Sequence, residues 1–334
     1  MRMNHRSVAI VLLSCLFTSA ALAYVVETPF NSDYAVADVG GPPGVPPNLG
    51  GLTFLARDPN TILIGGNAAG SLAAIYSIGV TRDAEHHVNG FDGVATRVAG
   101  ARGPANGGID GGLSHGPNGV LFFTSFRDNA LGQIKPGSTE PDKLTALGPL
   151  GVSTSVGALQ FVPQDLPGAN RLKLVSFNTG NWYDATITPD ANGTFDISSV
   201  GPAIRIGGGP EGVVYVRAGN PGFAADSILV SEWSVGRVSA YEIDANGDPI
   251  VATRRTFISG LDGAEGAAID PVTGDFLFST YGNENRVLVV GGFLPPPVVP
   301  EPAGWVLTLS GLGVLMWSSA RARSRRLVDG LAKA

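Results

Sequence analysis

The fold is decided by a stretch of sequence that returns, with changes, five times along the chain. Residues 112–126 read GLSHGPNGVLFFTSF. A glycine opens a short strand, a Pro-Asn-Gly turn follows, and an apolar run leads to a small residue and then to an aromatic or polar one. The apolar run, with the small residue and the aromatic or polar residue after it, recurs at Ile62–Gly66, Lys173–Phe177, Ile228–Trp233 and Phe276–Tyr281. Each copy has the length and the turn chemistry of a β-hairpin.

The glycines that open the five copies, here called the leading glycines, are Gly51, Gly112, Gly157, Gly212 and Gly266. Their spacings of 61, 45, 55 and 54 residues suit a four-stranded β-propeller blade with loops of variable length. The last copy ends after Val290 without a fourth strand, whereas residues 24–39 offer a spare strand before the first copy. We therefore expect an all-β propeller of five or six four-stranded blades, closed by the N-terminal strand. A β-sandwich and a parallel β-helix are the alternatives.

The strand pattern and the turn Asp270-Pro271-Val272-Thr273-Gly274 resemble those of NHL, SMP-30 and gluconolactonase propellers over most of residues 24–292. That resemblance implies a divalent cation at the mouth of the central channel, held by Glu, Asn and Asp side chains from different blades. It also implies metal-dependent lactone hydrolysis as one activity to consider.

The N-terminal 23 residues have the composition of a cleavable Sec signal peptide. Arg2 and Arg6 precede an apolar run, and Ala21-Leu22-Ala23 is a small-x-small cleavage signal that predicts a mature start at Tyr24. A lipoprotein signal at Cys15 is the alternative. Cys15 is the only cysteine of the chain, so the mature protein is predicted to have no disulfide and no thiolate ligand.

The C-terminal end combines three signals. A proline-rich linker (293–302) precedes an uncharged apolar segment (303–320) whose 18 residues could just cross a bilayer as a helix, and a basic tail (321–334) follows. The residues of the motif are Pro300, Glu301 and Pro302, with Arg321, Arg323, Arg325 and Arg326 after the apolar segment. This order resembles the PEP-CTERM sorting signal, which implies processing by an exosortase and delivery from the inner membrane to the cell surface or exopolysaccharide matrix. A plain, unprocessed membrane anchor is the alternative.

Between the predicted signal peptide and the basic tail, residues 24–320 are strongly acidic. Removing seven basic residues and Asp329 at the two ends from the 22 basic and 28 acidic residues of the chain leaves 15 and 27, a formal charge of −12. This balance disfavours nucleic acid and anionic lipid as partners and is compatible with cation binding.

Polar residues recur at two repeat positions that we expect at the channel mouth. Those just before the innermost strands are Asn48, Asp110, Ser155, Glu211 and Glu265, and those after the second strands are Asn67, Asp128, Asn178, Glu232 and Asn283. Because Ca²⁺ takes carboxylate and amide oxygens, we predict a Ca²⁺ site from Asn48, Asp110, Glu211 and Glu265. Aromatic side chains are expected to be exposed beside this rim, where they would either stack on sugars or cap the blades, namely Trp182, Tyr183, Trp233 and Tyr281. The predicted ligand-contacting set is Asn178, Trp182, Glu232, Trp233, Tyr281 and Asn283.

These features favour a non-catalytic exported propeller that binds a polysaccharide or an envelope protein. A structural component of biofilm matrix and a lactonase that uses Asp110, Glu211 and Glu265 are the alternatives. No HExxH zinc motif occurs in the sequence, and no catalytic residue is assigned.

Overall fold

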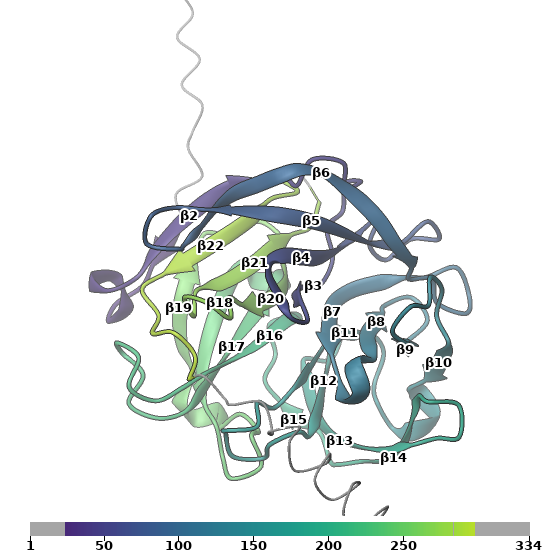
Figure 1. The fold of residues 1–334 in the computed structure, drawn as a ribbon. Helices are drawn as coiled ribbons and strands as arrows, with labels where there is room; N and C mark the ends of the chain where they lie inside the picture. The colour runs from purple at the N-terminus through teal and green to yellow at the C-terminus, as the bar shows by residue number, and fades with distance from the viewer. Residues whose placement is uncertain (1–23, 283, 298–334) are drawn as a thin grey trace, which may run out of the picture. The chain divides into compact units, whose positions relative to one another are not determined.

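Five antiparallel sheets stand around a common axis, and each sheet is one blade of a β-propeller (Figure 1). The computed structural model describes residues 24–282 and 284–297. The predicted signal peptide, the Pro-Glu-Pro motif, the apolar segment and the arginine cluster lie outside these residues. Within the described part of the chain, no helix has the length and apolar character needed to span a membrane.

The blades follow one another along the chain, and each runs from an inner to an outer strand. Blade 1 contains β3 (Leu52–Leu55), β4 (Asp58–Gly66), β5 (Ala74–Arg82) and β6 (Val88–Gly100). Blade 2 contains β7 (Ile109–His115), β8 (Leu121–Ser125), β9 (Ala130–Ile134) and β10 (Lys143–Ala146). Blade 3 contains β11 (Val156–Phe161), β12 (Leu172–Ser176), β13 (Asn181–Pro189) and an outer edge made of β14 (Phe195–Val200) and β15 (Ile204–Arg205). Blade 4 contains β16 (Pro210–Val216), β17 (Ser227–Glu232), β18 (Arg237–Glu242) and β19 (Arg255–Ser259).

Blade 5 is completed by the N-terminal part of the chain. Its strands β20 (Ala264–Ile269), β21 (Phe276–Thr280) and β22 (Val287–Gly291) pair in order, and β2 (Ala35–Gly40) adds the outer strand antiparallel to β22. The shorter β1 (Val25–Val26) pairs with β19 of blade 4. The predicted closure by an N-terminal strand is thus confirmed, and the blade number is five. Short 3-10 helices occur at Phe30–Ser32, Pro117–Gly119, Gly148–Leu150, Trp233–Val235 and Val251–Thr253.

The core consists of five apolar clusters, one between each pair of consecutive blades. Adjacent residues in the second strand of a blade point into different clusters. In β8 of blade 2, Phe122 packs towards blade 3 and Phe123 packs towards blade 1. A strand whose two faces are both buried reads as a continuous apolar run instead of an alternating one. This explains the uninterrupted apolar residues in every copy of the repeat.

Close contact between inner strands explains the leading glycines. A Cβ atom at Gly112 would lie 2.7 Å from the backbone nitrogen of Leu159 in the next blade, and one at Gly212 would lie 2.3 Å from the carbonyl oxygen of Glu265. At Gly266 it would lie 2.5 Å from Gly51, which closes the ring. Since real Cβ contacts are not this short, only glycine permits these approaches.

The inner strands also meet across the axis. A Cβ atom at Gly111 of blade 2 would lie 2.0 Å from the carbonyl oxygen of Glu211 in blade 4. In blade 2 the small residue of the repeat is Thr124, whose hydroxyl connects two inner strands. It accepts a hydrogen bond from the backbone N–H of Gly112 (3.0 Å) and donates one to the carbonyl of Gly157 (2.6 Å). Backbone therefore fills the centre of the propeller at this level.

The C-terminal limit of the core lies beyond the last strand. Phe293, the first residue of the expected linker, is buried and its ring lies 4.5 Å from that of Tyr34. The backbone N–H of Leu294 donates a hydrogen bond to Asn220 (2.7 Å).

Candidate functional site

Three carboxylates that the sequence placed before the inner strands meet at the propeller axis. Oxygen atoms of Asp110, Glu211 and Glu265, one from each residue, lie within 4.8 Å of one another. We call these residues the acidic trio. Their side chains come from blades 2, 4 and 5 and are 4%, 3% and 2% exposed. The structure thus brings together three of the four residues that the sequence predicted as ligands of a Ca²⁺ site.

The trio is positioned by irregularities in the strand pairing. The register shifts between Ile109 and Leu113 in β7, between Pro210 and Gly212 in β16, and between Ala264 and Ala267 in β20. Each member of the trio lies inside one of these shifts. A bulge leaves a residue out of the ladder and turns its side chain away from the regular alternation, which here directs the carboxylates to the axis.

Burial dominates the electrostatics of the trio. It raises the pKa of Asp110 to about 7, although hydrogen bonding with Glu211 and Glu265 acts in the opposite direction. Burial, and then the negative charge of Asp110, raise the pKa of both glutamates well above their ordinary value. Three carboxylates in one buried place repel one another and lose hydration, so their proton affinity rises unless a cation is bound.

A pocket of about 250 Å³ opens above the trio. Its lining residues are Ala69, Asp110, Phe126, Phe177, Glu211, Trp233, Glu265 and Tyr281. We call it the axial pocket. Two oxygen atoms of the trio, Oδ2 of Asp110 and Oε2 of Glu211, are buried and have no hydrogen-bond partner among the described residues. Polar atoms in a protein interior are almost always paired, so this pair points to a ligand.

The other predicted rim residues are placed differently. Asn48 is half-buried and is not among the residues that line the axial pocket; its backbone N–H donates to the side chain of Asn285. Asn178 is exposed, and Asn283 is outside the described residues. Ser155 is buried and its hydroxyl donates to the carbonyl of Phe126.

Glu232 is fully buried and already paired with basic side chains. Its Oε2 lies 2.7 Å from Nε of Arg237 and also contacts Arg254, while Oε1 accepts a hydrogen bond from Tyr241 (2.9 Å). The expected exposure of Trp182 and Tyr183 is wrong, because both rings lie in blade interfaces. Trp182 is fully buried and donates a hydrogen bond from Nε1 to Asp248 (2.7 Å).

Two aromatic residues that line the pocket were missed by the sequence prediction of the ligand-contacting set, Phe126 and Phe177. Like Trp233 and Tyr281, which were predicted and do line the pocket, each directly follows the second strand of its blade. The signal was present in the repeat, whose last position is aromatic in four copies. Because an aromatic residue in a repeat is as easily explained by packing, this pattern alone does not identify Phe126 and Phe177 as pocket residues.

No protein-family model matches the chain, and no curated protein matches its sequence. The chain is similar to a putative gluconolactonase (10% identity, TM-score 0.41, covering 80% of this chain and 97% of that one). It is also similar to virginiamycin B lyase from Staphylococcus aureus (13%, 0.39, 77% and 99%) and to an auxiliary nutrient binding protein from Bacteroides ovatus (10%, 0.44, 78% and 76%). At these identities the likeness extends no further than the propeller fold, which the chain's own five sheets define.

Proposed function

We propose that this protein is an exported binding module whose axial pocket binds a divalent cation on the acidic trio, with Ca²⁺ as the first candidate. The observation that carries the proposal is the pair of buried, unpartnered oxygen atoms on Asp110 and Glu211. A buried carboxylate without a partner destabilises the fold, and it is retained where a ligand supplies the missing charge.

The other buried carboxylates differ from the acidic trio because each has a basic partner. Seven acidic residues are buried in the described part of the chain, and four of them have a basic partner. These pairs are Glu232 with Arg237, Asp248 with Lys173, Asp270 with Arg82, and Asp275 with His87, at 2.6 to 2.7 Å. The three without a basic partner are the acidic trio. The fold thus neutralises its buried carboxylates everywhere except at the axis.

The donor set suits a hard cation. Ca²⁺ takes about six to eight oxygen ligands, and three carboxylates supply between three and six. The remaining ligands would come from water in the axial pocket. The cation would therefore stabilise the fold by neutralising the buried carboxylates.

A second candidate function is metal-dependent lactone hydrolysis at the same site. The acidic trio offers carboxylates both to hold a metal and to accept a proton. A lactonase would need Asp110 to accept a proton while Glu211 and Glu265 hold the metal. Release of acid from gluconolactone, measured with and without Ca²⁺, tests this candidate.

The location of the protein belongs to the same proposal and is supported by the sequence of its two ends. A Sec signal would export the chain, and the Pro-Glu-Pro tail would direct it through an exosortase to the cell surface or the exopolysaccharide matrix. Fractionation of cells that express the full chain, or a chain with Pro300, Glu301 and Pro302 replaced by alanine, tests this. Loss of the processed form in the variant is expected.

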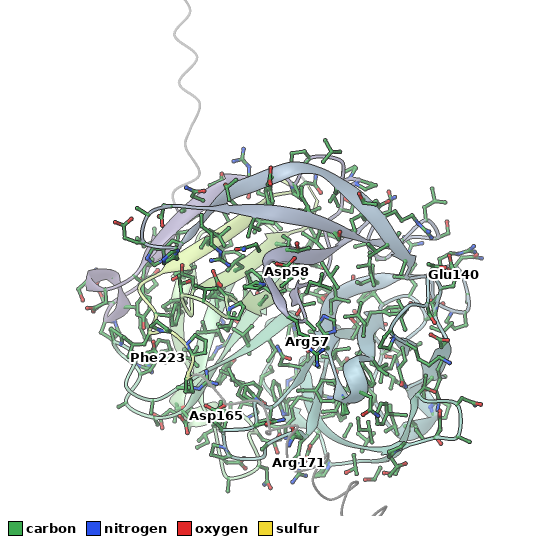
Figure 2. All side chains as sticks on the ribbon, viewed as in Figure 1. Arg57, Asp58, Glu140, Asp165, Arg171 and Phe223 are labelled. Carbon is green, nitrogen blue, oxygen red and sulfur yellow. The ribbon has the colours of Figure 1, made fainter. Side chains whose placement is uncertain are left out.

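The cation site is tested on the purified full-length protein after treatment with a chelator. Calorimetric titration with Ca²⁺ should give one site, and a concentration of 100 times Kd should stabilise the fold by about 2.7 kcal/mol. Glu211→Gln should abolish this binding. Glu140→Gln is the matched control, because Glu140 lies at the outer edge of the molecule (Figure 2) and its side chain is 63% exposed. Absence of Ca²⁺ binding in the wild type would refute the calcium assignment.

A further inference from the structure

Aromatic rings form the wall of the axial pocket above the acidic trio. They are Phe126, Phe177, Trp233 and Tyr281, here called the aromatic wall. Each directly follows the second strand of blades 2, 3, 4 and 5 respectively. Blade 1 has Asn67 at this position and contributes Ala69 to the pocket. Four of the five blades therefore present a ring to the same small volume.

Three of these rings form a continuous arc. The centroids of Phe126 and Phe177 are 5.5 Å apart with an interplanar angle of 81°, and those of Phe177 and Trp233 are 5.9 Å apart at 67°. These are edge-to-face pairs, which hold each ring in a fixed orientation. The wall is thus built before any ligand arrives, which lowers the entropic cost of binding.

The charges around the pocket select the ligand class. Among the described residues that line it there is no Lys, Arg or His, whereas three carboxylates form its floor. The face of an aromatic ring also attracts positive charge, and most strongly so for Trp. An anionic ligand would be repelled by the floor, and a neutral apolar one would leave the oxygen atoms of Asp110 and Glu211 unpaired.

We propose that the organic ligand of the axial pocket is a primary amine in its ammonium form, carried on an apolar or aromatic body. This inference rests on the proposal that the trio is a cation site, and it names the ligand class of that site. The ammonium group binds the trio, and the body lies against Phe126, Phe177 and Trp233. The volume of about 250 Å³ limits the ligand to a small molecule, since pockets for drug-sized ligands measure about 300–1,000 Å³.

The geometry of the floor fits three hydrogen bonds from one nitrogen. An ammonium group donates up to three hydrogen bonds with N···O distances of about 2.8 Å. The oxygen atoms of the trio lie within 4.8 Å of one another, so a single nitrogen can reach all three. Because the ammonium nitrogen and Ca²⁺ occupy the same place, they must exclude each other.

The test is calorimetric titration of the full-length, chelator-treated protein with benzylamine at neutral pH. Benzyl alcohol, which has the same ring and no charge, and tetramethylammonium, which has charge and no N–H donor, are the ligand controls. We expect benzylamine to bind at one site at least tenfold more tightly than either, and Ca²⁺ to reduce its apparent affinity competitively. Equal binding of benzylamine and benzyl alcohol would overturn the inference.

Substitutions in the wall separate this inference from the proposed function. Phe177→Leu should weaken benzylamine binding by about 5- to 30-fold and leave Ca²⁺ binding unchanged, which also shows that the variant is folded. Leu72→Ala is the control, because Leu72 is 76% exposed and does not line the pocket. If Ca²⁺ binds and benzylamine does not, the amine assignment is wrong and the cation site stands. If neither binds, both proposals are wrong.

Discussion

Arg82 joins the first and last blades of the propeller, and its replacement by methionine should destabilise the fold strongly. Its guanidinium forms a bidentate ion pair with Asp270 in the turn between β20 and β21, at 2.6 and 3.1 Å. It also donates hydrogen bonds to Asn60 and to the carbonyls of Pro59 and His86. The side chain of Asp270 is 0% exposed and that of Arg82 is 10% exposed. Arg82→Met therefore leaves a buried carboxylate without a cation.

Removal of one partner from a buried ion pair costs about 3–5 kcal/mol. For a domain of this size, Tm falls by about 2–4 °C for each kcal/mol lost from the free energy of unfolding. The Tm of Arg82→Met should therefore fall by roughly 6–20 °C. Arg97→Met is the matched control. Arg97 also joins blade 1 to a neighbour, but its ion pair with Glu140 is exposed, with side chains 50% and 63% accessible. Such a pair contributes at most about 1 kcal/mol.

The measurement is equilibrium unfolding in guanidinium chloride, followed by tryptophan fluorescence. The double variant Arg82→Met/Asp270→Asn should recover part of the loss, because it removes the unpaired charge along with its partner. If Arg82→Met costs no more than Arg97→Met, the closure of the ring does not depend on this ion pair and the reasoning is wrong.

Three further predictions concern the seam between blades, the inner ring and the C-terminal limit. Hydrogen bonding to Asp275 raises the pKa of His87, so the stability that protonated His87 contributes should be lost as pH rises above about 6.5. The loss of Tm in His87→Gln relative to wild type should therefore be larger at pH 5 than at pH 8, and the acidic trio, whose pKa values are also raised, cancels from this comparison because it is unchanged in both proteins. Gly112→Ala should lower the free energy of unfolding by about 1–3 kcal/mol, whereas Gly201→Ala, whose Cβ would have no contact shorter than 3.4 Å, should stay within about 0.5 kcal/mol in the same denaturation assay. Phe293→Ala should cost about 3–5 kcal/mol in urea unfolding, and an unchanged midpoint would show that residues after Gly292 are dispensable.

Local sequence patterns were sufficient to predict the fold because the constraint on each blade is local. The leading glycines mark the places where inner strands touch, and the apolar runs mark strands with two buried faces. The spare strand before Gly51 predicted that the ring is closed by the N-terminus. The choice between five and six blades needed the structure, since it depends on which distant segment pairs with β22.

The candidate site was predicted in part. The positions of Asp110, Glu211 and Glu265 follow from the repeat. Whether the carboxylate of Glu232 is available to a ligand depends instead on its ion-pair partners. One partner could have been found: Glu232 and Arg237 face each other across the β17–β18 hairpin. The other, Arg254, comes from the segment before β19, and no local pattern connects it to Glu232. Trp182 was misplaced because it lies in the third strand, which is away from the axis and covered by the next blade.

The contact between Gly111 and Glu211 across the axis has a consequence for how a ligand could be exchanged. Backbone of blades 2 and 4 meets across the axis beside the acidic trio, so the axial pocket does not continue along the axis between Gly111 and Glu211. A molecule must leave by the route through which it arrived, and no chain can thread through the ring. If the physiological ligand is part of a polymer, only a terminus or a side branch can reach the trio. The binding capacity of such a polymer would then scale with its number of ends or branches and not with its length.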